Sequence, residues 1–131
     1  MKLQCGCKNI SIDWIRNSVE LNCRVCACDY CQKNKAEYIS EPDSSFSFHI
    51  NDADNHKVVK HGHETATFHE CKNCGVVFVT CEIDETCYGI INAKVMGVKG
   101  YILDPEPRDY SAETVEERLT RRKDRWSKVH S

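Results

Sequence analysis

Ten of the 131 residues are cysteines, and seven of them fall into short motifs whose spacing suits metal binding. The densest stretch is NCRVCACDYCQK, residues 22–33, which holds Cys23, Cys26, Cys28 and Cys31. A disulfide needs Cα atoms about 4.4–6.8 Å apart with correctly directed Cβ atoms, and cysteines this close in sequence rarely meet that condition. Closely spaced cysteines in a reducing compartment are more often metal ligands. Zinc is the predicted metal.

The most specific motif is Cys71-x-x-Cys74-Gly75. A turn of this kind brings two sulfurs to one ion, and its backbone N–H groups can point at sulfur and offset the thiolate charge. Gly75 permits the unusual backbone angle with which such a turn often ends. Structural zinc takes four ligands, and Cys5-Gly6-Cys7 is the natural source of the other two. A shared ion would tie the N-terminal strand to the middle of the chain.

The second set, Cys26-x-Cys28-x-x-Cys31, packs three sulfurs closely enough to share another ion. Four protein thiolates would complete the tetrahedral shell of a zinc ion, whereas three leave one position for water or a substrate. A zinc with such a position can take a small thiol as its fourth ligand and favour its deprotonated form. Cys23 lies three residues before Cys26, so spacing alone permits it as a fourth ligand; the alternative is a buried cysteine at the end of a strand.

The pattern between these motifs predicts a mainly β domain of short antiparallel strands. Residues 9–23 alternate apolar and polar positions on both sides of Asn17-Ser18, which predicts a hairpin. Further strands are predicted at 46–50, 57–60, 76–81 and 88–96. Residues 104–131 would form a stiff linker and a C-terminal helix over 112–126, capped by Ser111, with an apolar stripe of Val115, Leu119 and Trp126. The whole chain, residues 1–131, is predicted to be one domain.

Composition excludes several classes of protein. A net charge of −2 gives no reason to expect nucleic acid as a partner, and the basic run Arg121-Arg122-Lys123 alternates with acidic residues, so it is predicted to be a solvated helix face. No stretch approaches the roughly 20 apolar residues that a membrane span needs. The N-terminus lacks the apolar run of a signal peptide, which favours a cytoplasmic location.

Cys5-Gly6-Cys7, then CACDYCQK, then CKNCG, in this order, resemble the glutathione-dependent formaldehyde-activating enzyme (GFA) family, also called the centromere protein V family. The matching segments run through most of residues 5–75. The sequence departs from the usual pattern at Ala27, where histidine is common, and at Gln32, where arginine is common. Both positions lie beside the second cysteine set.

The resemblance implies a small zinc-pinned fold, related to that of a Rab exchange factor, with two zinc ions. Cys5, Cys7, Cys71 and Cys74 would hold a structural zinc; Cys26, Cys28 and Cys31 would hold a catalytic zinc. It also implies a carbon–sulfur lyase that joins glutathione to formaldehyde, and it favours burial of Cys23. Lys33 would offset the charge of the bound thiol or bind a substrate carboxylate, unless it is a solvated lysine. One of the six histidines could supply acid–base catalysis.

Two other functions remain open on the sequence. If Cys23 is a fourth ligand, both zinc ions are structural and the domain is a protein-interaction module. The thiols themselves could also act as a redox or metal buffer.

Overall fold

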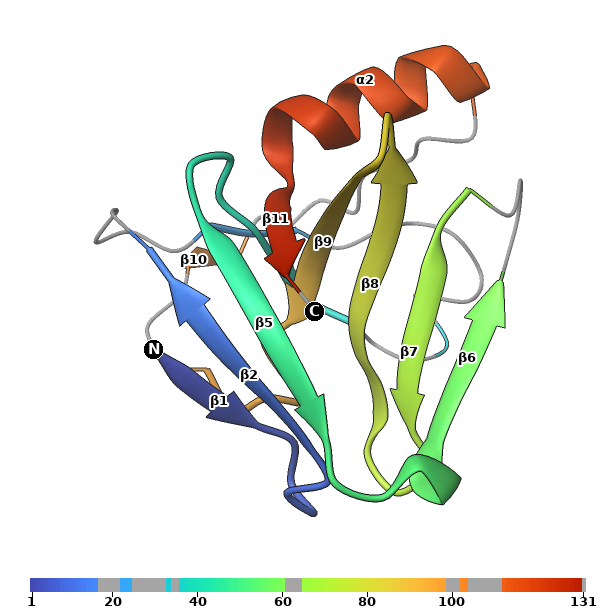
Figure 1. Ribbon diagram of the computed structural model, residues 1–131. Helices are drawn as coiled ribbons and strands as arrows, with labels where there is room; N and C mark the ends of the chain where they lie inside the picture. The colour runs from blue at the N-terminus through green and yellow to red at the C-terminus, as the bar shows by residue number, and fades with distance from the viewer. Residues whose placement is uncertain are drawn as a thin grey trace.

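The chain folds as a mainly β domain, with one α-helix near its C-terminus in the part that the structure describes (Figure 1). The structure is a computed structural model that describes residues 1–16, 22–24, 33, 36–60, 65–98, 102–103 and 112–130. The strands within those ranges are β1 (Lys2–Gln4), β2 (Ile10–Ile15), β3 (Asn22–Arg24), β4 (Tyr38–Ile39), β5 (Ser45–Ile50), β6 (His56–Lys60), β7 (Thr67–Cys71), β8 (Gly75–Ile83), β9 (Thr86–Asn92), β10 (Ile102–Leu103) and β11 (Ser127–His130). A 3-10 turn, η1, covers Ala53–Asn55, and the helix is α2 (Val115–Arg125).

Strand β2 has two neighbours, and neither is the strand that the sequence suggested. It pairs with β1 on one edge and, over its whole length, with β5 on the other. Strand β3 instead pairs with β4, and in parallel with β10. The predicted hairpin over 9–23 is therefore wrong, although Ile10, Ile12 and Trp14 all point into the core as their alternation predicted. Alternation defines the buried face of a strand, but it does not choose the partner.

The sheet divides at β9. Strands β6, β7, β8 and β9 follow one another as antiparallel neighbours. The other edge of β9 is shared, because β11 pairs at Tyr88 and Gly89 while β4 pairs at Ile91 and Asn92. Most pairs are antiparallel, as predicted for this mainly β domain, but β11 runs parallel to β5, so the sheet is mixed. The strand predicted over 88–96 ends at Asn92 and continues as a turn.

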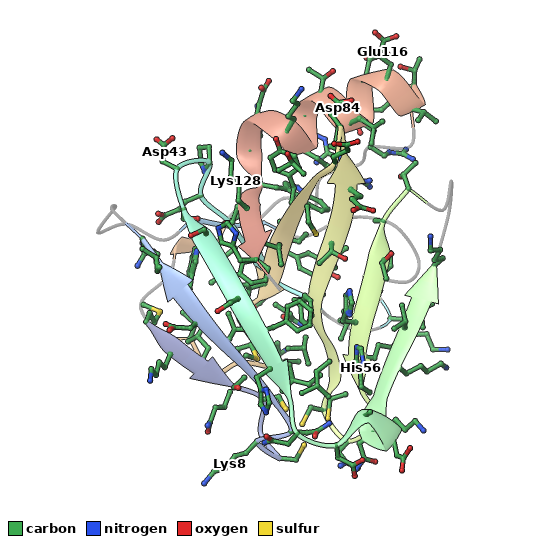
Figure 2. The ribbon with its side chains drawn as sticks, in the orientation of Figure 1. Lys8, Asp43, His56, Asp84, Glu116 and Lys128 are labelled. Atoms are coloured by element: carbon green, nitrogen blue, oxygen red, sulfur yellow. The ribbon has the colours of Figure 1, made fainter. Side chains whose placement is uncertain are left out.

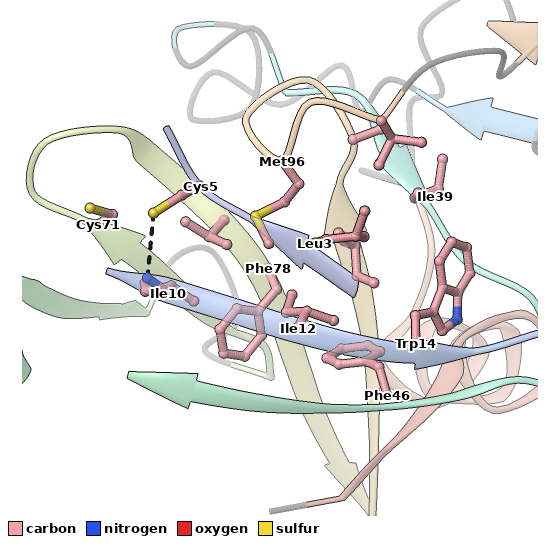
Figure 3. Close-up of a cluster of buried hydrophobic side chains, with 14 residues drawn as sticks. Leu3, Cys5, Ile10, Ile12, Trp14, Ile39, Phe46, Cys71, Phe78 and Met96 are labelled. Atoms are coloured by element: carbon pink, nitrogen blue, oxygen red, sulfur yellow. Dashed lines mark hydrogen bonds between the residues drawn. The ribbon is translucent and has the colours of Figure 1, made fainter. Parts of the chain in front are cut away.

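Two hydrophobic clusters fill the interior. The first, shown in Figure 3, contains the inward side chains of β2 together with Phe46, Phe78 and Met96. Cys5 and Cys71 lie at its border and belong to it by burial. The second includes Phe68, Val79 and Cys81, and it packs against Leu119 and Trp126 from the C-terminal segment. The N-terminal turn and the β7–β8 turn therefore share one packed core.

The helix begins at Val115 and is capped by Thr114, so the prediction of Ser111 as its cap is wrong. The Thr114 hydroxyl accepts a hydrogen bond from the Glu117 N–H at 3.1 Å, and the Glu117 carboxylate accepts one from the Thr114 N–H at 3.4 Å. This reciprocal pair is a capping box, which sequence shows as a threonine three residues before a glutamate. No helix in the described ranges is long and apolar enough to cross a bilayer.

Thr114→Ala is expected to lower the free energy of unfolding by about 1 kcal/mol, because the N-terminal N–H groups of α2 lose their acceptor. The matched control is Thr120→Ala, an exposed threonine within the same helix, where loss of the hydroxyl should change stability by less than ~0.5 kcal/mol. Urea unfolding followed by far-UV circular dichroism compares the two. Equal effects of both substitutions would contradict the cap.

Arg122 corrects the prediction of a solvated basic face on this helix. Its side chain is buried, and its guanidinium lies 4.9 Å from the centre of the Trp126 ring. Its Nη1 donates to Thr65 Oγ1 at 2.9 Å and lies 3.4 Å from Cys81 Sγ. Burial lowers the pKa of Arg122 from its usual value. This guanidinium joins the helix to Thr65, just before β7, and to Cys81 of β8, and it stacks on Trp126 at the end of its own helix rather than reaching solvent.

Candidate metal centre

Two turns of similar construction meet at one end of the molecule (Figure 1). The β1–β2 turn carries Cys5 and Cys7, and the β7–β8 turn carries Cys71 and Cys74. In each turn a backbone N–H three residues on donates to the carbonyl of the first cysteine: Lys8 to Cys5 at 2.8 Å, and Cys74 to Cys71 at 3.2 Å. The two turns thus share this backbone hydrogen bond, although the second cysteine lies two residues after the first in one turn and three residues after it in the other.

The residue after the second cysteine of each turn has a left-handed backbone. Gly75 has φ of +96°, as its place in the motif predicted, and Lys8 has φ of +66°. A non-glycine residue adopts this conformation infrequently. Here it directs the chain from Cys7 back into β2, so that Asn9 and Ile10 are buried at once. Figure 2 shows sulfur atoms close to the turn that carries Lys8.

The four sulfurs lie within 4.8 Å of one another. Cys7 Sγ is 3.3 Å from Cys71 Sγ and 3.7 Å from Cys5 Sγ. In a tetrahedral zinc site with Zn–S bonds of about 2.3 Å, the sulfurs are about 3.8 Å apart. These two separations lie just below this value and no pair of sulfurs is more than 4.8 Å apart, so small side-chain adjustments would place four thiolates around one ion. The donor set and its dimensions therefore fit zinc.

Backbone N–H groups also point at the sulfurs. The Cys7 N–H donates to Cys74 Sγ and the Ile10 N–H donates to Cys5 Sγ, both at 3.4 Å; the second contact is drawn in Figure 3. The first contact joins the two turns directly. Such donors stabilise negative charge on sulfur, which a thiolate centre requires.

The four thiols differ in exposure and in acidity. Cys5 and Cys71 are each 1% exposed, Cys74 is half-buried and Cys7 is exposed. The Asn9 N–H and the neighbouring Cys71 thiol lower the pKa of Cys7 to about 6, whereas burial raises the pKa of Cys71 and raises that of Cys74 to about 12. Without a cation the buried members therefore favour the neutral thiol. A divalent cation supplies the charge that would let all four ionise.

The second predicted ligand set lies outside the described residues. Its members are Cys26, Cys28 and Cys31. The backbone of Cys23 belongs to β3, where it pairs with Ile39 and Leu103. Lys33 has an exposed side chain. The structure thus brings together the four cysteines of one predicted site, and the other site stays a prediction.

Cys81 and Cys87 lie on either side of the β8–β9 turn but do not form a disulfide. In the β8–β9 register Cys81 lies opposite Tyr88, while Cys87 lies opposite Glu82. Neighbouring positions on a strand point to opposite faces, so the two thiols lie on different sides of the sheet. Both are free thiols, Cys81 buried and Cys87 half-buried.

Sequence did not single out any histidine, but the structure joins two of them to a buried threonine. His56 Nε2 lies 3.1 Å from His69 Nδ1, and His69 Nε2 lies 3.0 Å from Thr80 Oγ1. The His69 ring also stacks on Phe78 with centroids 4.2 Å apart. Burial, and then the charge of a protonated His56, lower the pKa of His69 to about 4. His69 and Thr80 lie on neighbouring strands, so no local sequence pattern indicates these hydrogen-bonded side chains.

His69 is expected to make the protein less stable as pH falls from about 6.5 toward 4. Its folded-state pKa is below its usual value, so the unfolded chain binds the extra proton across this window. Between pH 7 and pH 5 the loss attributable to His69 is at most about 2 kcal/mol. Urea unfolding at both pH values should show a smaller pH effect in His69→Gln than in the native chain. His49→Gln, at an exposed position, should leave the pH effect unchanged; an unchanged pH effect in His69→Gln would contradict the prediction.

Comparison with known proteins gives a fold and no function. No family model matches the sequence, and no curated protein matches it. Among solved structures, a Rhodobacter sphaeroides protein determined by crystallography as a Northeast Structural Genomics target is similar, with a TM-score of 0.56. The two chains are 18% identical, and the match covers 79% of this chain and 100% of the other. This likeness shows that the two proteins share a fold.

Proposed function

We propose that this protein is a zinc enzyme of the GFA type, which forms or breaks a bond between glutathione, or a similar small thiol, and an electrophilic carbon such as that of formaldehyde. The observation that carries the proposal is the meeting of Cys5, Cys7, Cys71 and Cys74 within 4.8 Å. These are the four positions to which the resemblance assigns a structural zinc. They come from two motifs that flank CACDYCQK in the sequence.

The four-cysteine centre has an architectural role in this proposal. Its ligands come from β1–β2 and β7–β8, and two of them border the main core. It fixes the N-terminal turn on the middle of the chain. Thiol chemistry is assigned to Cys26, Cys28 and Cys31, which would hold a second zinc through three thiolates. A zinc held in this way supplies a fourth position that accepts a thiol and lowers its pKa.

Lys33 follows this second set by two residues and has an exposed side chain, and its ammonium group is assigned to the bound thiol in this proposal. A glutathione thiolate would add negative charge to a centre that already has three, and an ammonium group nearby would offset part of it. A Lys33→Ala variant is expected to bind glutathione several-fold more weakly with the zinc content unchanged. Unchanged affinity and turnover would remove Lys33 from the site.

The zinc count and its response to thiol test the proposal. Metal analysis of the purified chain should give two zinc ions. In the cobalt-substituted protein the sulfur-to-cobalt charge-transfer band should grow saturably with added glutathione, and Cys26→Ser should abolish this growth. Cys87→Ser is the matched control, because Cys87 lies outside the three motifs. A spectrum that already shows four sulfurs at both sites, unchanged by glutathione, would reject the enzyme and favour a protein-interaction module.

Product formation is the second test. With ¹³C-formaldehyde and glutathione, NMR should show S-hydroxymethylglutathione reaching equilibrium faster with the protein than without it. If glutathione changes the cobalt spectrum while formaldehyde gives no acceleration, the thiol assignment stands and the electrophile is another carbon compound. Screening would then turn to larger thiol adducts.

A further inference from the structure

The four ligands of the described centre are not equally protected from solvent. Cys5 and Cys71 are 1% exposed and Cys74 is half-buried, whereas Cys7 is exposed. A solute that reaches this centre therefore meets Cys7 first. Exposure of one ligand residue opens the centre to solutes that the buried ligands exclude.

The Cys7 sulfur lies closer to Cys71, on the other turn, than to Cys5 of its own motif. Cys7 Sγ is 3.3 Å from Cys71 Sγ and 3.7 Å from Cys5 Sγ. A disulfide bond is about 2.0 Å long, so Cys7 and Cys71 would need to approach by about 1.3 Å. Cys5 and Cys7 are separated by one residue, which makes a bond between them unfavourable. Cys71 is thus a better-placed partner than Cys5 for an oxidised Cys7.

We propose that this centre is a redox-sensitive device in which a peroxide converts Cys7 and Cys71 from zinc ligands into a disulfide, with release of the zinc. The inference concerns the four-cysteine centre and does not rest on the proposed enzymatic function. The oxidant is hydrogen peroxide or an organic hydroperoxide.

The chemistry balances in two steps. The Cys7 thiolate attacks a peroxide oxygen; an S–O bond forms, the O–O bond breaks, and the leaving hydroxide, or the alkoxide of an organic hydroperoxide, takes a proton to become water or an alcohol. The Cys71 thiolate then attacks the Cys7 sulfur; an S–S bond forms, the S–O bond breaks, and a second hydroxide leaves and is protonated. Two electrons pass from the two sulfurs to the peroxide. Only Cys5 and Cys74 remain as thiols, and two thiolates hold zinc far more weakly than four.

The position of the new bond has a structural consequence. A Cys7–Cys71 bond joins the β1–β2 turn to the β7–β8 turn, the same two turns that the ion joins. The covalent link therefore replaces the metal link, and the fold survives the loss of zinc. Bonds within either turn would instead leave the two turns without a link to each other. The geometry favours a switch that releases metal without unfolding.

The sequence offers a direct assay of this bond. Zinc-loaded full-length protein is treated with hydrogen peroxide, free thiols are alkylated, and the chain is digested with trypsin. Cleavage after lysine gives peptide 3–8 with Cys5 and Cys7, peptide 61–72 with Cys71 as its single cysteine, and peptide 73–94 with Cys74, Cys81 and Cys87. We expect a link between 3–8 and 61–72, one zinc ion released for each link, and an unchanged far-UV spectrum. Reduction in the presence of zinc should restore the metal.

Two matched variants assign the sulfur within peptide 3–8. Cys5→Ser and Cys7→Ser each remove one ligand, but only Cys7→Ser should lower the yield of the link more than tenfold. If either variant does not fold, fragmentation of the native linked peptide between Cys5 and Cys7 gives the same assignment. A dominant link to 73–94 or within 3–8, zinc release without the 3–8 to 61–72 link, or no release of this zinc would overturn the proposal.

Discussion

Cys71→Ser is expected to remove one zinc ion from the protein and to lower its free energy of unfolding by several kcal/mol. Cys71 lies 1% exposed at the border of the main core, and it contributes one of four sulfurs within 4.8 Å. Apparent zinc-binding energies of structural sites in small peptides are on the order of 10 kcal/mol, and a domain is stable by about 5–15 kcal/mol in total. Losing a buried ligand therefore removes a large share of the stability.

Metal analysis and urea unfolding in the presence of excess zinc measure both effects. The control is Cys87→Ser, a half-buried thiol outside the motifs, which should retain all zinc and lose less than ~0.5 kcal/mol. The Tm of the native protein should also rise with the concentration of free zinc, whereas the Tm of Cys71→Ser should not. A Cys71→Ser protein with native zinc content and stability would show that the four sulfurs meet without holding an ion.

The candidate centre could be predicted because two short sequence motifs each supply a pair of its ligands. Each turn contains two cysteines at short spacing, and Gly75 marks the backbone angle that ends the second turn. Nothing in the sequence marks Lys8 in the same way, because lysine adopts its positive φ here only under the constraint of the surrounding fold. The sequence also gave no measure of the exposure difference between Cys7 and Cys71, which depends on how the two turns pack.

Several strand positions were predictable, whereas β4, β7, β10 and β11 were not predicted and the predicted pairing of β2 was wrong. The alternation of Ile10, Ile12 and Trp14 identified a buried face, because side chains on a strand alternate between two sides. The partner of that strand is β5, about thirty residues further along the chain, with Trp14 opposite Phe46. A long-range pairing of this kind is selected by the total burial of both strands, and no short window of sequence contains that quantity. The prediction of the helix cap was wrong for a simpler reason. Ser111 and Thr114 are both suitable capping residues, but only Thr114 has a glutamate three residues later that completes a capping box.

Strand β11 was missed altogether, and a glycine explains how it fits. Ser127–His130 follows α2 directly and inserts between β5 and β9. A Cβ atom at Gly89 would lie 2.6 Å from Val129 Cγ2, 2.7 Å from Phe46 Cζ and 3.0 Å from the Val79 carbonyl oxygen. Side chains of β5 and β11 and the backbone of β8 therefore come close together at a position where β9 has no side chain. The four residues of β11 form too short a pattern to be recognised as a strand in the sequence.

Gly89→Ala is accordingly expected to lower the free energy of unfolding by about 1–3 kcal/mol, because the added methyl group overpacks this contact. The strain should fall mainly on β11, since Val129 is half-buried on a terminal strand while Phe46 is fully buried in the core. Val129→Ala removes the atom that the new methyl group would meet first. Its own cost should be modest, and the double variant should recover about 1 kcal/mol of the loss caused by Gly89→Ala.

A double-mutant cycle by urea unfolding measures this recovery, with Val129→Ala alone as the matched control. Coupling between the two substitutions requires that β9 and β11 touch at these residues, so it tests a strand that no sequence pattern indicated. Additive effects, or a Gly89→Ala protein as stable as the native chain, would place β11 elsewhere. Because β11 also runs beside β5, whose Phe46 pairs with Trp14 of β2, displacement of β11 should loosen the sheet that carries the N-terminal turn. Gly89→Ala should therefore weaken zinc retention at the Cys5 and Cys7 end without altering any ligand.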